Sequence, residues 1–249
     1  MTTHLYCVLP HEMRGSLPAG LSGLAGERVR ALLVDGLVAW VSDVKWAIPV
    51  SVEGVRAHDA VVEAALETGT TPVPARFGQR FESDDACREA LRNRASLVES
   101  VLADVHGSIE MTLIITPSTR RMIRELEPVL PEMFDSETER PGRRYLDSLR
   151  RREATTGAIK SAMDELVRAL SRAAGPLLRR TTVLYQVSRL PLRTISHLIA
   201  RDQVAAYKAA VAGVESSAEL RFLVIGPRAP YSFSSLTDSG GRHGMNLAD

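Results

Sequence analysis

The sequence predicts an α+β protein built from two domains. Residues 1–116 alternate strand and helix patterns around one short hairpin, which is typical of a ferredoxin-like antiparallel sheet with helices on one face. Residues 142–235 begin with a long helical pattern, so we expect a second α+β domain with a long, coiled-coil-like helix. The prolines of residues 117–141 predict a linker with a short helix, and the Gly-rich residues 236–249 predict a disordered tail.

The front half begins with three strand patterns. Residues 4–9 are apolar and end at a proline. Residues 29–34 and 37–43 flank Asp35-Gly36, a dipeptide that favours a two-residue hairpin with a type I′ turn. Both faces of the strand after this turn are apolar, so we expect that strand in the middle of the sheet.

Two helices and a strand complete the front half. Residues 51–66 predict a helix capped by Ser51, and residues 83–106 predict a second helix capped by Ser83. Residues 109–116 follow as a strong strand pattern. The side chains expected to form the buried face of the first helix are Val55, Val62, Ala65 and Leu66.

The back half contains one long helical pattern followed by a shorter block. Residues 142–174 carry apolar side chains at three- and four-residue steps, and at about 1.5 Å per residue this helix exceeds about 40 Å. Gly175-Pro176 then ends it. We expect a strand at 182–188, a helix at 195–211 and a strand at 220–225, the last in the centre of its sheet because both its faces are apolar.

Composition indicates a cytoplasmic globular protein. The 249 residues carry a net charge of +1, no apolar run long enough to span a bilayer and no signal peptide pattern, so we expect no membrane partner. Residues 1–116 hold 10 basic and 15 acidic side chains, whereas residues 117–249 hold 21 and 15. This asymmetry suggests that the halves pair with each other or with different partners. Cys7 and Cys87 fit a reducing compartment, and we expect no disulfide between them.

Motifs for enzyme chemistry are missing from the sequence. The six histidines and two cysteines form no ligand pair at zinc spacing, and neither a phosphate-binding glycine loop nor a nucleophile elbow is present. We therefore expect no metal, no cofactor and no catalytic residues. His58-Asp59 on the first helix has two interpretations, an acid–base pair or a solvated, capping pair. Adjacent helical residues do not face each other, which favours the second.

Residues 72–78 are the most unusual segment of the front half. Pro72 and Pro74 hold the chain extended, and Gly78 permits a turn that other residues resist. In one interpretation Phe77 fills the core and Arg76 pairs with a nearby carboxylate. In the other, the segment is a rigid binding loop. The residue types favour the first and leave the second open.

A basic cluster at residues 140–153 marks the start of the long helix. It contains six arginines together with Tyr145 and Leu146. Nucleic-acid binding needs a basic face with several stacking aromatics, but residues 140–153 contain a single aromatic side chain, Tyr145. A solvated helix start or an anionic protein partner is therefore favoured, and no nucleic-acid partner is expected.

Residues 226–233 carry the sharpest pattern of the back half. Gly226, Pro227 and Pro230 predict a rigid turn directly after a strand, and Tyr231 and Phe233 alternate beyond it. These rings either fold back and cap the second domain or form a contact surface. We expect them to fold back, because burying both rings contributes several kcal/mol at about 25 cal/mol per Å².

Four segments, taken in order, resemble the GvpF/GvpL family of gas vesicle proteins. The likeness covers residues 4–233, and it departs from the family pattern at Arg228-Ala229 and at Ala75. The segments are Leu5-Tyr6 with the strand at 36–41, His58-x-x-Val-Val-Glu leading to Thr71-Pro-Val-Pro-Ala-Arg-Phe-Gly-Gln-Arg-Phe, the Gly-Arg-Arg-Tyr-Leu run from Gly142, and Gly-Pro-Arg-Ala-Pro-Tyr-Ser-Phe from Gly226.

The resemblance implies two α+β domains, the first ferredoxin-like, and a role in gas vesicle formation. It implies binding to the small, hydrophobic GvpA-like shell protein and to other accessory proteins, a location at the gas vesicle, and no catalytic residues. We expect the front domain to carry the shell-protein contact. The alternatives are a ferredoxin-like small-molecule-binding or enzymatic module and a nucleic-acid binder. The candidate contact residues are Pro72, Pro74, Arg76, Phe77, Gly78, Tyr145, Leu146, Gly226, Pro227, Pro230, Tyr231 and Phe233.

Overall fold

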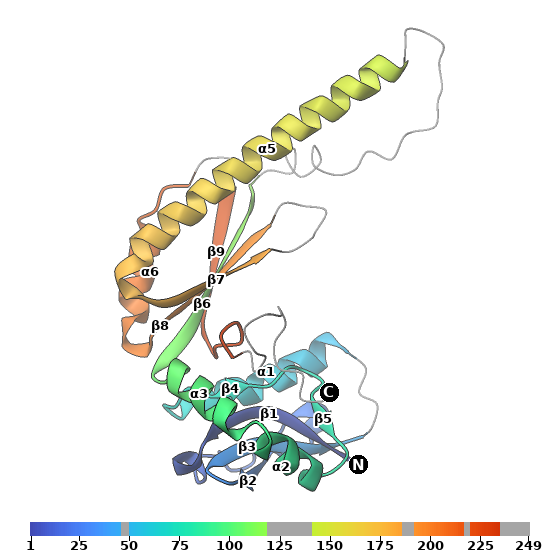
Figure 1. Ribbon diagram of the computed structural model, residues 1–249, viewed down its shortest axis with the longest axis vertical. Coiled ribbons are helices and arrows are strands. Elements are labelled where there is room, and N and C mark those ends of the chain that lie inside the picture. Colours follow the sequence, from blue (N-terminus) through green and yellow to red (C-terminus); the bar gives the residue numbers. More distant parts are fainter. Residues whose placement is uncertain (46–49, 119–140, 186–191, 217–219, 235–249) are drawn as a thin grey trace. The chain divides into compact units, whose positions relative to one another are not determined.

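The computed structural model describes two compact units (Figure 1). The first unit consists of Met1–Glu110, Leu198–Arg201 and the described residues from Pro227 onwards, and the second of the described parts of Met111–His197 and Asp202–Gly226. The chain therefore passes between the units several times, and neither unit is one continuous stretch. The described residues are 1–45, 50–118, 141–185, 192–216 and 220–234, so most of the expected linker and the whole expected tail lie outside them.

The first sheet is centred on β1 (Thr2–Pro10). On one side β1 pairs antiparallel with β3 (Leu37–Val44), and β2 (Arg30–Val34) lies outside β3. On the other side β4 (Val73–Pro74) and β5 (Arg80–Phe81) pair with the two ends of β1. The expected internal position of β3 is confirmed.

The hairpin between β2 and β3 forms at Asp35-Gly36, but its turn is not type I′. Val34 pairs with Leu37, so the loop has the expected two residues. Gly36 has a φ of 76°, whereas Asp35 is not among the residues with positive φ. A type I′ turn needs positive φ at both central positions, and a side chain at the first one disfavours it.

Three helices accompany this sheet. The first, α1 (Val52–Glu67), begins after Ser51, whose side chain accepts a hydrogen bond from the Gly54 amide at 3.0 Å as expected. The single helix expected at 83–106 is wrong, because α2 (Asp84–Arg92) and α3 (Ala95–Val105) are separate. Asn93 is a poor helix former, and the break after it lets both helices keep their apolar faces on one core.

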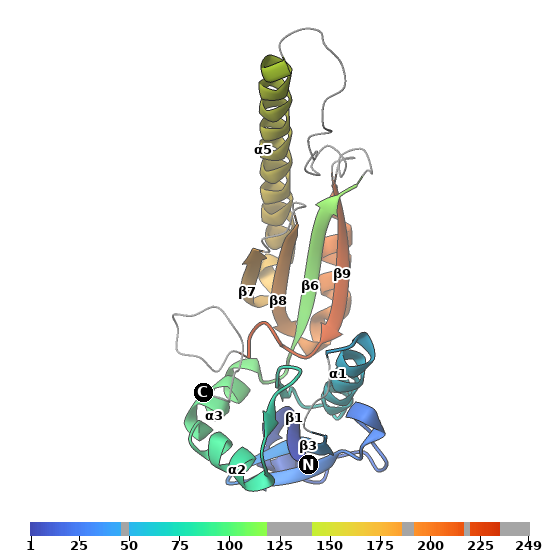
Figure 2. The same ribbon diagram turned by 90° about the vertical axis from the view of Figure 1, so that its right-hand side faces the viewer.

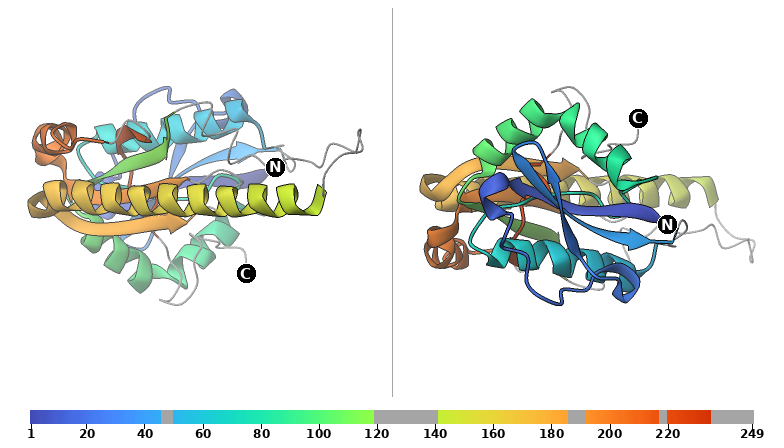
Figure 3. Two further views of the ribbon diagram at one scale, coloured as in Figure 1. Left: turned by 90° about the horizontal axis from the view of Figure 1, so that it is seen from above. Right: turned by 90° about the horizontal axis from the view of Figure 1, so that it is seen from below.

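Helices cover both faces of the first sheet, not one face as expected (Figure 3, right). Side chains of α2 and α3, including Leu91 and Val98, join one buried cluster with β1, β2 and β3. Side chains of α1, including Val61 and Val62, join a second cluster around Trp40 on the other face. Strands that are apolar on both faces must be covered on both, and that pattern excludes a two-layer arrangement.

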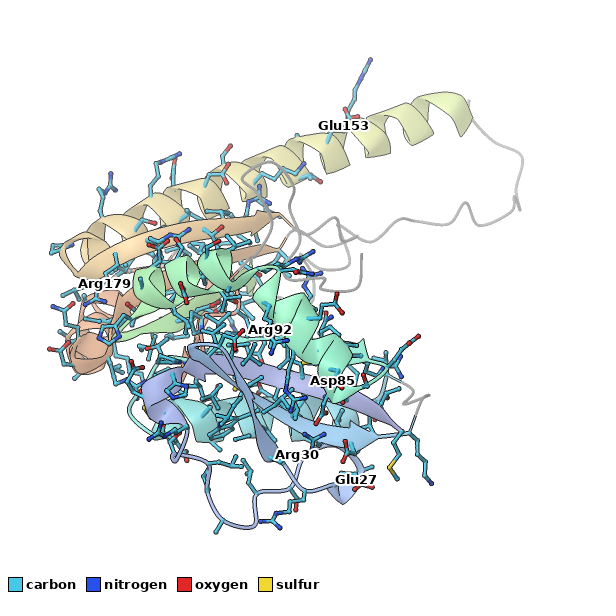
Figure 4. The ribbon with its side chains drawn as sticks, turned by 60° about the horizontal axis from the view of Figure 1, so that its bottom comes forward. Glu27, Arg30, Asp85, Arg92, Glu153 and Arg179 are labelled. Carbon is cyan, nitrogen blue, oxygen red and sulfur yellow. The ribbon has the colours of Figure 1, made fainter. Side chains whose placement is uncertain are left out.

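Charged side chains tie α2 to the hairpin. Arg30 of β2 pairs with both Asp43 and Asp84 at 2.7 Å. Arg92, labelled with Arg30 in Figure 4, donates to Asp35 at 2.8 Å. These side chains are partly exposed, so solvent screens each pair and the pairs mainly orient the helix.

The second sheet has the order β7-β8-β6-β9. Figure 2 shows α5 (Pro141–Ala174) and α6 (Val204–Ala212) beside it. The 34 residues of α5 give a length of about 51 Å. Its expected apolar positions from Ile159 onwards are buried, and Glu153 points away from the helix (Figure 4). The view from above in Figure 3 shows α5 as one uninterrupted helix. The strands are β6 (Ser108–Pro117), β7 (Leu178–Tyr185), β8 (Arg193–Ala200) and β9 (Leu220–Arg228).

Two expectations for this sheet are wrong. Residues 195–200 belong to β8, not to a helix, and α6 begins only at Val204. Ser196 contacts Thr112 whereas His197 contacts Tyr207 of α6, which is the two-residue alternation of a strand. The strand at 220–225 lies at an edge of the sheet, not at its centre, because β6 takes the inner position beside β8.

Candidate functional site

The Pro-rich segment at 72–81 forms an edge of the first sheet. Pro72 and Pro74 are buried, and their missing amide donors are tolerated because an outer strand has a free side. The Ala75 amide donates to the Tyr6 carbonyl at 2.8 Å, and the Leu5 amide donates to the Gln79 carbonyl at 3.0 Å. Between these two hydrogen bonds, residues 76–79 do not pair with β1 and instead form a turn.

We call residues 76–79 the contact turn. The Gln79 amide donates to the Arg76 carbonyl at 3.1 Å, and Gly78 has a φ of 90°. A positive φ at the third position is the requirement of a type II turn, so Gly78 performs the role expected from its sequence position. Arg76 and Gly78 are exposed and Phe77 is half-buried.

Phe77 rests on the start of α1. A Cβ added at Gly54 would lie 3.2 Å from the Phe77 Cζ atom, so only glycine leaves the ring undisturbed there. The ring also meets His58 edge-on, with centroids 5.9 Å apart. Phe77 therefore contributes to the core cluster on the α1 face and still reaches solvent. Arg76 shows no ion pair with any described carboxylate, so the expected local pairing is not found.

A chain of hydrogen bonds through two histidines supports the contact turn from beneath. The Nε2 atom of His58 lies 3.0 Å from the Ala75 carbonyl oxygen, which can only accept, so His58 Nε2 carries a proton. The Nδ1 atom of a neutral His58 is then an acceptor, and the Nε2 atom of His4 donates to it at 2.9 Å. The remaining nitrogen, His4 Nδ1, is buried without a hydrogen-bond partner.

Both rings are kept neutral by their surroundings. Burial, together with the smaller effects of the neighbouring His58 and Arg80, lowers the pKa of His4 to about 3. Burial likewise lowers the pKa of His58 to about 4, against a smaller opposite effect of its bond to Ala75. An imidazolium would lose its hydration here without gaining an anionic partner in the pair.

His58 is therefore buried, whereas the sequence had favoured a solvated, capping pair with Asp59. It is 2% exposed, and the buried positions of α1 are His58, Val61, Val62, Ala65 and Leu66. These positions follow the i, i+3, i+4, i+7, i+8 pattern of an amphipathic helix once the histidine is counted as apolar. Val55 lies on the same stripe one turn earlier, but it is 42% exposed, so its expected burial is wrong.

Tyr6 extends the polar core beside His4. Its hydroxyl accepts from the Leu24 amide at 2.8 Å and lies 2.7 Å from the Ser42 Oγ atom. The His4 and Tyr6 rings meet edge-on, with centroids 4.7 Å apart. These bonds attach the loop after β1 to the same face of the sheet as α1.

An apolar surface lies at the start of α1. Val50 is 83% exposed and Val52 is 61% exposed, and the less exposed Val55 follows one turn later. Sequence periodicity missed the first two, because it identifies buried stripes and gives no weight to isolated valines before a helix. Arg56, which follows Val55 on α1, is exposed. Arg76 is exposed on the contact turn.

The segment from Pro227 to Ser234 packs onto the first unit, whereas the sequence had placed it on the second domain. Arg228 forms an ion pair with Asp59 of α1, and its Nε atom lies 3.8 Å from Glu63 Oε1. Ala229 is completely buried in the cluster on the α1 face, and Tyr231 packs against the same cluster.

The end of this segment also contacts the first unit. The Glu110 carboxylate accepts from the Ser232 amide at 2.8 Å and from the Ser232 hydroxyl at 2.7 Å. Phe233 is 5% exposed and belongs to the cluster on the α2 and α3 face. Both rings fold back as expected, but onto the first unit and not onto the second domain. Gly226, with a φ of 127°, belongs to the second unit and precedes Pro227, where the segment begins.

The remaining candidates lie on α5. Tyr145 and Leu146 are helical, but their side chains are outside the described residues, as are several of the clustered arginines. Arg150 is described and exposed. The contact turn and the basic cluster thus belong to different units.

Among the described residues, no three His, Cys, Asp or Glu side chains gather in a way that could hold a metal ion. None of the helices within the described ranges is both long enough and apolar enough to cross a lipid bilayer. Cys7 and Cys87 are free and buried. The first unit presents a turn with an exposed arginine, a half-buried aromatic ring and exposed valines at the start of α1.

Known proteins resemble this chain over most of its length. Residues 2–235 match the family described as gas vesicle synthesis protein GvpL/GvpF. Gas vesicle protein F1 of Halobacterium salinarum is 29% identical over 194 residues, covering 71% of this chain and 91% of that protein. The crystal structure of GvpF from Anabaena sp. PCC7120 has a TM-score of 0.75 at 17% identity, covering 97% of this chain and 99% of that one. GvpF from Microcystis aeruginosa has a TM-score of 0.69, also at 17% identity, with 94% and 99% covered.

Proposed function

Because this chain belongs to the GvpL/GvpF family of gas vesicle synthesis proteins, we propose that it assists vesicle assembly by binding the small hydrophobic shell protein. The family match over residues 2–235 is the observation that carries this proposal. We place the contact on the first unit, at the contact turn and the exposed start of α1. Its place of action is the cytoplasm and the growing gas vesicle, together with other accessory proteins.

Physical chemistry supports an apolar docking surface for such a partner. A shell protein with large apolar surfaces must be covered before it polymerises, because exposed apolar patches drive aggregation. Val50 and Val52 expose more than half of their surface at one end of a capped helix. Apolar side chains of the partner would bury against them without disturbing the core.

The contact turn adds rigidity to this surface. Its type II geometry and the hydrogen bonds on both sides fix the backbone before any partner arrives. A preorganised turn loses little conformational entropy on binding, so more of the contact energy appears as affinity. Exposed Arg56 and Arg76 would favour a partner whose apolar face is bordered by acidic side chains.

Co-purification of the full-length chain with the shell protein tests the proposal. Val52→Asp places a charge in the apolar surface, and we expect it to reduce captured shell protein about tenfold or more, as for a central interface residue. Leu33→Asp is the matched control, because Leu33 is 51% exposed on β2, at the opposite edge of the same sheet. Equal capture by both variants and the unmodified chain would show that this surface is not the contact.

Full-length protein is needed for these tests. Arg201 donates to the carbonyls of Leu66 and Thr70 at 2.8 and 3.2 Å, and its amide donates to the Gly107 carbonyl at 3.0 Å. A fragment ending at residue 116 lacks these bonds and also lacks Phe233. Loss of binding by such a fragment would therefore report damage to the first unit as well as loss of a contact.

A further inference from the structure

Two neutral histidines connect three elements of the first unit in one line of hydrogen bonds. The line runs from His4 of β1 to His58 of α1 and ends at the Ala75 carbonyl, next to the contact turn. We propose that His4 and His58 form an acid-sensitive latch, which holds the contact turn on α1 while both rings are neutral and releases it when either ring is protonated. The proposal concerns the turn itself and holds whether or not the turn binds the shell protein.

The geometry of the latch tolerates no additional proton. His58 uses Nε2 to donate to Ala75 and Nδ1 to accept from His4. A proton on His58 Nδ1 would place two N–H groups against each other across 2.9 Å. A proton on His4 must enter at Nδ1, which is buried without a partner in a side chain that is 0% exposed. Either event breaks the line or leaves an unpaired buried charge.

The groups that face the latch from neighbouring elements do not offset such a charge. The positive charge of Arg80 on β5 acts on His4 and opposes its protonation. Asp59, adjacent to His58 on α1, favours protonation but is already paired with Arg228. Tyr6 of β1 shares its hydroxyl with Ser42 of β3 and with the Leu24 amide.

Phe77 is a residue of the contact turn that contacts both histidine rings. Its ring covers His58 edge-on at 5.9 Å and lies 6.3 Å from the ring of His4. Because the turn residues cover both imidazoles, opening of the turn gives the rings access to water. Two independent features, the hydrogen-bond line and the ring contacts of Phe77, therefore couple the turn to the protonation of the pair.

The size of the effect follows from proton linkage. Rings freed by opening titrate near 6.5, whereas the closed latch keeps them neutral down to about pH 4. Between pH 7.5 and pH 5.0 the opening equilibrium should rise about 30-fold for each histidine that is freed, and about 10³-fold if both are freed.

Amide hydrogen exchange on the full-length protein measures this opening. The reporters are the Ala75 amide, bonded to Tyr6, and the Gln79 amide, bonded to Arg76. The reference is the His11 amide, bonded to the Gly36 carbonyl on the hairpin side of the sheet. After correction for intrinsic exchange rates, protection at the reporters should fall at least 30-fold between pH 7.5 and 5.0, and much less at the reference. An equal fall at all three amides would mean global unfolding and would overturn the latch.

Variants identify which proton is responsible. His58→Gln keeps an N–H that can reach Ala75 but cannot titrate, and His4→Gln keeps a donor towards His58. Each should remove about 30-fold of the pH effect if both rings are normally freed, and the double variant should remove all of it. His197→Gln is the matched control, because His197 is an equally buried histidine of the second unit. A pH effect that survives in the double variant, or disappears in His197→Gln, contradicts the proposal.

Discussion

Two Pro-aromatic segments of the first unit have similar composition and opposite roles. The contact turn follows Pro72 and Pro74 and leaves Arg76 exposed. The segment from Pro227 to Ser234 is held by an ion pair, by the Glu110 carboxylate and by the buried Phe233 ring. Proline and aromatic residues thus predict a rigid backbone in both places, but the partners of the flanking side chains decide which segment can face another protein.

The largest expected contrast between the two segments lies in their phenylalanines. Phe233→Ala removes a buried ring and should lower the free energy of unfolding of the first unit by about 3–5 kcal/mol. Phe77→Ala removes a half-buried ring and should cost less than half of that. Urea unfolding followed by tryptophan fluorescence measures both, because Trp40 is buried in the first unit. Equal losses would mean that the contact turn is as much a part of the core as the C-terminal segment.

The second largest expected effect is that acid lowers the free energy of unfolding of the first unit through His4 and His58. The pKa of His4 is lowered to about 3 and that of His58 to about 4, so between pH 6.5 and about 4 the unfolded chain binds protons that the folded chain does not. Stability is complete above pH 6.5 and decreases as the pH falls through this window. At pH 5.5 the pair should cost about 3 kcal/mol relative to pH 7.5. Urea titrations at the two pH values check this, and the His4→Gln, His58→Gln double variant should lose the difference.

The Glu110 anchor should have a smaller effect. Ser232→Ala removes the hydroxyl bond to Glu110 and leaves the amide bond, so we expect a loss of about 1–2 kcal/mol. Ser234→Ala is a suitable control, because its hydroxyl bond to the Tyr231 carbonyl is local and longer, at 3.3 Å. If Ser232→Ala matched the control in urea unfolding, the carboxylate would not fasten the segment.

The smallest expected effect comes from the glycine of the contact turn. Gly78→Ala must adopt a φ near 90°, which should cost about 1 kcal/mol. No Cβ contact opposes the substitution, since nothing lies within 4 Å of the added atom. We expect capture of the shell protein to fall more than stability does, because the turn is displaced while the core is untouched. A change in stability without any change in capture would argue against a binding role for the turn.

Local features of this protein are determined by the sequence alone. The strand patterns, the two-residue hairpin, the Ser51 cap and the long helix each depend on neighbours a few residues away, and all were found. The sequence also contains no motif of the catalytic classes considered, and its motifs indicated the likeness to gas vesicle proteins. For the candidate site, the sequence identified the Pro-rich segment, Gly78 and His58, but not that His58 is buried beneath the segment and bonded to His4.

The tertiary structure decided which distant residues became partners. His58 met His4 across 54 positions, Ser232 met Glu110 across 122 and Arg228 met Asp59 across 169. Periodicity reports how a segment repeats, but it does not report which buried group will receive its hydrogen bonds or cover its apolar face. The same limitation explains the second helical layer of the first sheet, the edge position of β9 and the strand at residues 195–200, because each depends on which elements pack together.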